Sequence, residues 1–177
     1  AGGERRLQYI MDDTSIRTAV TAWFADAAAA ETTYGHISTW ATGGVTDMSY
    51  MFCTDSWVSS QCNSGASTFN DDISAWDTSG AKTMVAMFYG AAAFDRNIGS
   101  WATSSVNDMG EMFESATAFN QPIGTWDVSS VTKMENLFYF ASSFNQPLDN
   151  WDVRSVTHVG TLFSGGRGMY RMFYYAS

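Results

Sequence analysis

A segment of about 25 residues recurs along this chain and constrains its fold more than any other feature. The clearest copy begins at Phe119 and reads Phe-Asn-Gln-Pro-Ile-Gly-Thr-Trp-Asp-Val-Ser-Ser-Val. It returns at Phe144, and looser copies begin at Phe94 and Phe69. Regular repeats of this length are typical of solenoids, in which each unit buries its apolar face only against its neighbours. We therefore expect a stack of repeats around one continuous core.

Each repeat is expected to contain a short strand, a turn and a short helix, which makes the fold an α/β repeat of about five units. The strand is predicted around the Ile/Leu-x-x-Trp positions. The helix is predicted from about Val131 to Phe138 and at the equivalent positions of the other repeats. There, Val, Met, Leu and Phe recur at spacings that would place them on one buried helix face.

The two ends of the chain depart from the repeat. Residues 1–36 are predicted to form an N-terminal helical cap, with a helix from about Ile16 to Ala30 that follows an N-cap cluster beginning at Asp12. The repeats are assigned to residues 37–163, with an insertion at about 53–66. Residues 164–177 read as an incomplete C-terminal half-repeat. A stack that ends without a polar cap exposes a surface that favours a neighbour.

The insertion contains the two cysteines of the chain, Cys53 and Cys62. We expect a disulfide that closes a surface loop, and such a bond indicates an oxidising compartment. The alternative is a pair of reduced cysteines in a cytosolic protein. The two histidines, His36 and His158, lie far apart in the sequence, so neither a zinc site nor a Cys–His pair is recognisable. No metal ligand and no cofactor is predicted.

Most tryptophans occupy one position of the repeat. We interpret them as a core ladder, because a periodic aromatic residue in a solenoid usually fills the interior. The alternative is an aromatic platform for sugars. Trp57 lies outside this series, in the insertion, and is the better candidate for an exposed contact residue. The predicted core ladder consists of Trp40, Trp76, Trp101, Trp126 and Trp151.

A second series places Asn70, Asn120 and Asn145 in register with Asp95. We favour a ladder of side chains that satisfies backbone groups at a turn. A calcium ladder is the alternative, although the sequence lacks the glycine-rich, alternating Asp pattern of calcium-binding β-solenoids. The pair Asp71-Asp72 is the one place where a surface calcium ion would fit, and the sequence does not decide whether one binds there.

The string from Trp126 to Gln146 closely resembles the BspA-like leucine-rich-repeat surface proteins, in particular their tryptophan-containing subtype. That subtype also occurs in mycoplasma lipoproteins and marine protist proteins. The resemblance covers about Tyr34 to Phe163. It implies a leucine-rich-repeat-like solenoid, a secreted or cell-surface location, and a role in adhesion or protein binding. It implies no catalytic residues.

Composition and motifs exclude several function classes. The net charge of −9 and the presence of only two lysines argue against binding to a phosphate backbone. No apolar run approaches the roughly 20 residues of a membrane span. The sequence contains no nucleophile elbow, phosphate loop or dinucleotide fingerprint, so we predict that the protein is not an enzyme and has no catalytic residues.

Two functional hypotheses follow. The first is a secreted or cell-surface module that binds a protein or glycan on the faces of the solenoid. The second is a structural subunit that stacks end to end into a filament or extracellular layer, because contacts of this kind do not close. The second hypothesis places contact residues at the two ends of the stack, and they are Trp23, Phe24, Met172 and Phe173.

Overall fold

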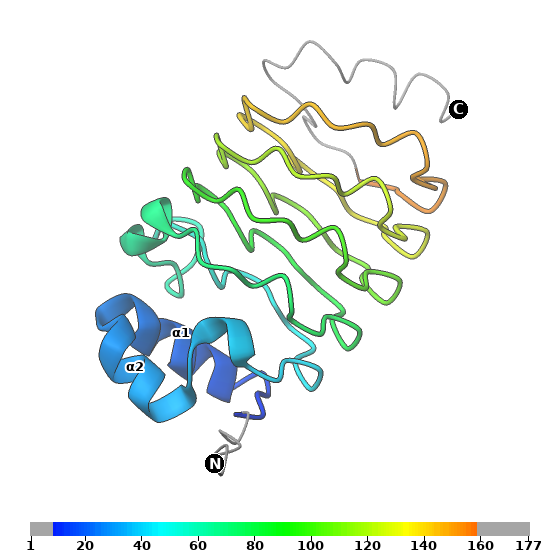
Figure 1. The fold of residues 1–177 in the computed structure, drawn as a ribbon. Helices are drawn as coiled ribbons and strands as arrows, with labels where there is room; N and C mark the ends of the chain where they lie inside the picture. Colours follow the sequence, from blue (N-terminus) through cyan, green and yellow to red (C-terminus); the bar gives the residue numbers. More distant parts are fainter. Residues whose placement is uncertain (1–8, 159–177) are drawn as a thin grey trace.

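The computed structural model describes residues 9–158, and within them the repeats stack as successive coils. Two α-helices, α1 (Ser15–Ala25) and α2 (Ala27–Tyr34), lie together at the N-terminal end of this stack (Figure 1). Two short 3-10 helices follow, η1 (Ile37–Thr39) at the start of the first repeat and η2 (Ser64–Thr68) at the end of the insertion. The N-terminal segment is therefore helical, and the coils follow it.

The expected strand-turn-helix unit is wrong. In residues 9–158 both α-helices precede the coils, and β-structure is limited to isolated bridges. The helix predicted at Val131–Phe138 is replaced by turns, in which Asn136 has a left-handed backbone with φ 52°. The N–H of Met134 bonds the carbonyl of His158 in the next coil, at 2.9 Å, rather than a carbonyl one helical turn back.

The predicted strand is also a turn. The backbone N–H of Trp126 donates to the carbonyl of Ile123, three residues earlier, at 3.1 Å. Both side chains are buried, although residues three apart in a strand would point to opposite faces. The fold is therefore a stack of turn-rich coils, and it is not an α/β solenoid.

Backbone hydrogen bonds join each coil to the next along a narrow ladder. Single parallel bridges connect Asp47 to Thr83, Thr83 to Asp108, Asp108 to Lys133, and Lys133 to His158. Each coil thus contributes one residue to a parallel ladder that runs the length of the stack. Because the partners sit in adjacent repeats, backbone groups are satisfied only when neighbouring repeats are folded.

The core consists of columns of stacked aromatic rings. Phe88, Phe113 and Phe138 stack at centroid separations of 5.6 Å, with nearly parallel planes. A second column follows Phe94, Phe119 and Phe144 in the same way, and the two columns touch within each coil. All of these rings are less than 4% exposed. Burial of one such side chain stabilises the fold by roughly 1.5–3 kcal/mol.

The five ladder tryptophans are between 1% and 6% exposed, so no ring face is available to a sugar. The indole N–H groups of the last four bond to carbonyls of the preceding repeat, whereas that of Trp40 bonds to the carbonyl of Gly35. The donor–acceptor pairs between repeats are Trp76 with Ile37, Trp101 with Ile73, Trp126 with Ile98, and Trp151 with Ile123, at 2.9–3.2 Å. Each tryptophan therefore fills the core, and these four also tie two coils together.

The predicted side-chain ladder is confirmed. Asn70 Oδ1 accepts the N–H of Asp95, Asp95 Oδ1 accepts that of Asn120, and Asn120 Oδ1 accepts that of Asn145, at 2.9–3.0 Å. These oxygens are bonded to amide groups, in place of the calcium ions of the alternative interpretation.

The single predicted helix at Ile16–Ala30 is two helices. Asp26 breaks it with an extended backbone, and its carboxylate caps α2 by accepting the N–H of Ala29 at 3.1 Å. Helix α1 then packs on the first coil through Trp23, whose ring lies 6.0 Å from that of Trp40. Neither helix is long and apolar enough to cross a membrane, and the same holds for every helix of residues 9–158.

Candidate functional site

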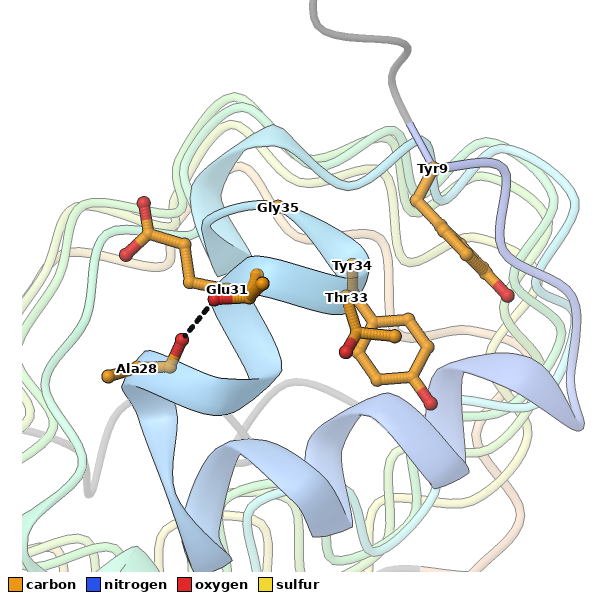
Figure 2. Close-up of a pocket in the computed structure, with 7 residues that line it drawn as sticks. Tyr9, Ala28, Glu31, Thr33, Tyr34 and Gly35 are labelled. Atoms are coloured by element: carbon orange, nitrogen blue, oxygen red, sulfur yellow. Dashed lines mark hydrogen bonds between the residues drawn. The ribbon is translucent and has the colours of Figure 1, made fainter.

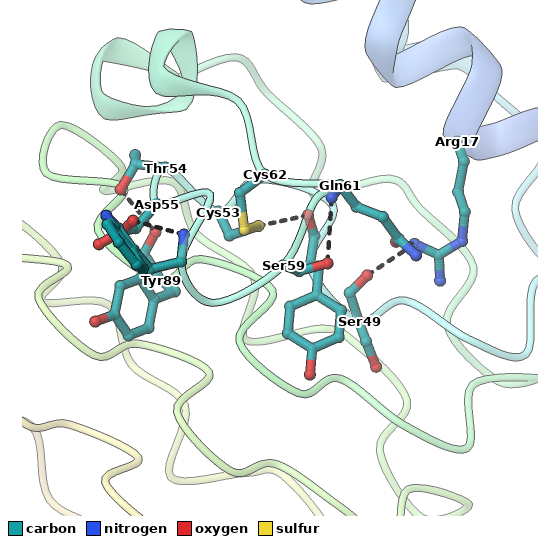
Figure 3. The surroundings of a disulfide bond; sticks show 11 residues. Arg17, Ser49, Cys53, Thr54, Asp55, Ser59, Gln61, Cys62 and Tyr89 are labelled. Carbon is teal, nitrogen blue, oxygen red and sulfur yellow. Dashed lines mark hydrogen bonds between the residues drawn. A yellow bond between two sulfur atoms is a disulfide. The ribbon is translucent and has the colours of Figure 1, made fainter.

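The disulfide loop is the most distinctive surface feature of the described residues. Cys53 and Cys62 are bonded, which confirms the sequence-based prediction (Figure 3). Two backbone bonds anchor the loop at its base. Asn63 N donates to the carbonyl of Cys53 at 2.8 Å, and Thr54 N donates to that of Tyr89 in the next coil at 2.9 Å. The loop is therefore closed covalently and fixed to the stack.

Trp57 lies in this loop with 94% of its surface exposed. Its backbone N–H donates to Oδ1 of Asp55 at 2.9 Å, which makes a tight local turn. A fully exposed indole is unusual, because tryptophan is on average among the more buried residue types. The structure thus places Trp57 at the surface, in a loop of restricted conformation.

An arginine from α1 links the loop to the N-terminal helices. The guanidinium of Arg17 donates to the carbonyl of Ser49 at 2.9 Å and to the side chain of Gln61, and it pairs with the carboxylate of Asp47 at 2.8 Å (Figure 3). One side chain therefore holds α1, the first coil and the loop in a fixed arrangement. Sequence analysis did not identify this contact.

Beside the loop lies a surface that we call the tyrosine face. Its aromatic members are partly exposed, and its carboxylates come from the turns of two successive coils. It consists of Tyr50, Tyr89, Tyr139, Phe140, Glu111, Glu114 and Glu135. Backbone hydrogen bonds hold these turns of successive coils next to one another. Gly90 N donates to the carbonyl of Glu114, and Ser115 N donates to that of Tyr139, both at 2.7 Å.

Left-handed backbone turns shape the tyrosine face. Tyr50, Glu111 and Asn136 have φ between 52° and 64°, and Phe140 has φ 56°. Such values are uncommon for residues other than glycine. Because the same turn recurs in successive coils, side chains from different repeats are brought to one side of the stack.

Burial and neighbouring negative charges disfavour the ionised form of two carboxyl groups of the tyrosine face, Glu111 and Glu114. Burial raises the pKa of Glu111, and the negative charges of Glu135 and Asp108 raise it further. The pKa of Glu114 is raised by burial and then by Glu111, against hydrogen bonds from Asn136 and Tyr89 that lower it. One carboxylate oxygen of Glu114, Oε2, is buried and has no hydrogen-bond partner among residues 9–158.

Burial and the same carboxylates also raise the pKa values of two tyrosines of this face. Burial raises the pKa of Tyr89, followed by the charges of Glu114 and Asp55. Burial also raises the pKa of Tyr50, followed by the charge of Glu111. The phenol groups of Tyr50 and Tyr89 therefore remain neutral at physiological pH, and the negative charge of the tyrosine face lies on its carboxylates.

Other candidate residues have structural roles. Asp71 accepts the indole N–H of Trp23 at 2.8 Å, and Asp72 accepts the N–H of Ser74 at 2.9 Å. Among residues 9–158, no group of three or more His, Cys, Asp or Glu side chains is suited to hold a metal ion. His36 pairs with its neighbour Ser38, at 2.8 Å between Nδ1 and Oγ, and not with a cysteine.

The predicted end contacts are only partly available. Trp23, in α1, is 7% exposed and packs against Trp40, so within the described residues it offers little surface for a contact. Phe24 is half-buried and packs edge-to-face against Phe52 and Phe69. Met172 and Phe173 lie outside the described residues.

A hollow of about 490 Å³ lies beside the last turns of α2 (Figure 2). It is lined by Tyr9, Ala28 and residues 31–35. The hydroxyl groups of Thr32 and Thr33 in its wall donate to carbonyls of their own helix. These two hydroxyl groups are therefore already engaged within α2.

Comparisons with known proteins give one match. The family model described as "Mycoplasma protein of unknown function, DUF285" matches residues 18–64 and 58–174. A search of curated proteins finds no match, and neither does a search of solved structures. Because the two matched segments together span most of the chain, this protein belongs to the Mycoplasma protein family of unknown function DUF285.

Proposed function

We propose that this protein is a non-enzymatic binding module of the extracellular or cell-surface type, which contacts a protein or glycan through the disulfide loop. The observation that carries the proposal is Trp57, which is 94% exposed in a loop closed by the Cys53–Cys62 bond. Tryptophan is the residue type most enriched among the side chains that dominate binding energy at protein interfaces. Its ring also stacks on the apolar face of sugars.

The rigidity of the loop supports this role. Ordering a flexible segment on binding costs free energy, and a loop that is fixed beforehand avoids most of that cost. The disulfide, the bond from Thr54 to Tyr89 and the contact between Gln61 and Arg17 all restrict the loop in the free protein. The position of Trp57 is thus set before a partner arrives.

The disulfide also supports the proposed location. Disulfides persist in oxidising compartments and are rare in reducing ones. The sequence resemblance to BspA-like surface proteins points to the same location and to adhesion. We do not propose end-to-end stacking, because Trp23 and Phe24 pack within the chain and no other observation favours assembly.

The proposal is tested by binding of the purified protein to arrays of extracellular matrix proteins and of glycans. We expect at least one ligand whose affinity falls by tenfold or more in Trp57→Ser. The matched control is Ile10→Ser, which removes another exposed apolar side chain (79% exposed) at the N-terminal end of the stack. Equal binding by Trp57→Ser and the parent protein, or no binding to either array, would refute the proposal.

A further inference from the structure

Exposed aromatic side chains continue from the disulfide loop across the tyrosine face. Phe140 is 52% exposed, and its ring centroid lies 4.3 Å from that of Tyr139. The backbone N–H of Ser115 donates to the carbonyl of Tyr139 in the next coil, and that of Gly90 donates to the carbonyl of Glu114. Gly90 also lies beside the side chain of Thr54, at the start of the disulfide loop. The bonded coils thus run from the start of the loop that carries Trp57 to the coil that carries Phe140.

The charge of this surface is unbalanced. Lys133 pairs with Asp108 at 3.1 Å and also lies in the field of Glu135, while Arg17 pairs with Asp47. Within residues 9–158, no ion pair joins Glu111, Glu114 or Glu135 to a basic side chain. These carboxylates repel one another in the free protein.

We infer that the tyrosine face binds a lysine- or arginine-rich segment of another protein, and this inference rests on the proposed function as a binding module. Charge complementarity selects the partner: the face gathers carboxylates that pair with no basic side chain of residues 9–158, on a protein with a net charge of −9. The aromatic rings add a second attraction, because ammonium and guanidinium groups bind the faces of aromatic rings.

The arrangement favours a basic segment over a single ion. The carboxylates occur in two successive coils, Glu111 and Glu114 in one and Glu135 in the next, with tyrosines on both sides. Several positive side chains spaced along an extended segment would each meet a carboxylate and an aromatic ring. The negative field of the whole protein would also accelerate their association at low ionic strength.

The experiment uses the full chain and a 12-residue peptide of alternating lysine and serine, with an alternating glutamate–serine peptide as the reference. We expect the lysine peptide to bind and the glutamate peptide not to bind, by isothermal titration calorimetry. Glu111→Gln should weaken binding about threefold, the effect of one partly screened charge. Phe140→Ser should weaken it as well.

The matched control is Asp149→Asn, which removes one exposed negative charge outside the tyrosine face. We expect it to change binding less than Glu111→Gln does. Equal effects of the two variants would show non-specific attraction and overturn the inference, as would equal binding of both peptides. A Trp57-dependent ligand in the arrays together with no binding of the lysine peptide would leave the proposed function intact and overturn only this inference.

Discussion

The indole N–H of Trp126 donates to the backbone carbonyl of Ile98, in the preceding coil, across 3.1 Å. Both groups are buried, so water cannot replace this bond. The same relationship recurs between successive repeats, and it explains why tryptophan rather than another large apolar residue occupies this position. Phenylalanine would fill most of the space but would remove this bond, and the Ile98 carbonyl would keep only the backbone N–H of Trp101 as a donor.

Trp126→Phe is therefore expected to lower the free energy of unfolding by about 0.5–1.5 kcal/mol, the usual net contribution of one hydrogen bond. Trp126→Ala should cost about 3–5 kcal/mol, because it also leaves a cavity. Urea denaturation followed by circular dichroism measures both values. Trp57→Phe is the control, and the exposed position should show no change. Equal stability of Trp126→Phe and the parent protein would contradict the role of the indole bond.

The ladder of Asn and Asp side chains gives a second prediction. Asn120 Oδ1 accepts the backbone N–H of Asn145 and the side-chain amide of Gln146. Asn120→Ala should lower the free energy of unfolding by about 1–2 kcal/mol, because a partly buried amide loses its acceptor. Asn120→Asp retains the oxygen, so we expect a smaller loss. The same urea titration distinguishes them, and equal losses would show that the ladder bond contributes little.

Sequence reasoning found the features that recur with the repeat. The period of about 25 residues marked the positions of Trp126 and Asn120 as structural, because a residue that returns in every unit usually satisfies a contact between units. The cysteine pair was recognised for a different reason, since both cysteines lie in a single insertion. These features depend on local sequence or on the register of the repeat, and both are visible without a structure.

The secondary structure of the repeat could not be predicted in the same way. Val131, Met134, Leu137 and Phe138 have the spacing of a helix face, but they point inward equally well from a series of turns. The turns prevail because the backbone N–H groups bond to the next coil, as that of Met134 does with His158. Contacts between repeats thus decide whether the segment forms a helix or a series of turns, and the sequence of a single repeat does not reveal these contacts.

The tyrosine face was missed because its residues are dispersed in the sequence. The insertion displaces Tyr50 from the register of later repeats, and Glu111 and Phe140 look like ordinary surface residues. Alignment of the repeats after removal of the insertion would have placed them in adjacent rows. Their left-handed backbone would still have been unexpected, because none of them is glycine.

The disulfide provides a third prediction. The double substitution Cys53→Ser/Cys62→Ser should lower the free energy of unfolding by about 2–3 kcal/mol, from the entropy of closing a short loop. It should also increase the hydrogen exchange of amides in residues 54–61, while amides of the coils, such as that of Met109, stay protected. Uniform loss of protection along the chain would show instead that the disulfide supports the whole stack.

The charges of the tyrosine face make stability depend on pH. Burial, then the charges of Glu135 and Asp108, raise the pKa of Glu111 in the folded protein. Folding therefore favours the protonated form. The contribution of Glu111 to stability is greatest below its unfolded pKa and is lost as the pH rises through its raised folded pKa. At neutral pH the charged group consequently opposes folding.

Glu111→Gln keeps the shape of the side chain and removes the charge. We expect this variant to raise the free energy of unfolding at pH 7 by a few tenths of a kcal/mol, since solvent screens this half-exposed site. The advantage should shrink as the pH falls and vanish below the unfolded pKa, where the carboxyl group of the parent protein is protonated in both states. Thermal unfolding of both proteins from pH 4 to pH 8 measures the difference. Asp149→Asn, away from the tyrosine face, should not show this trend, and an advantage of Glu111→Gln that is constant with pH would show that repulsion among the carboxylates is not its cause.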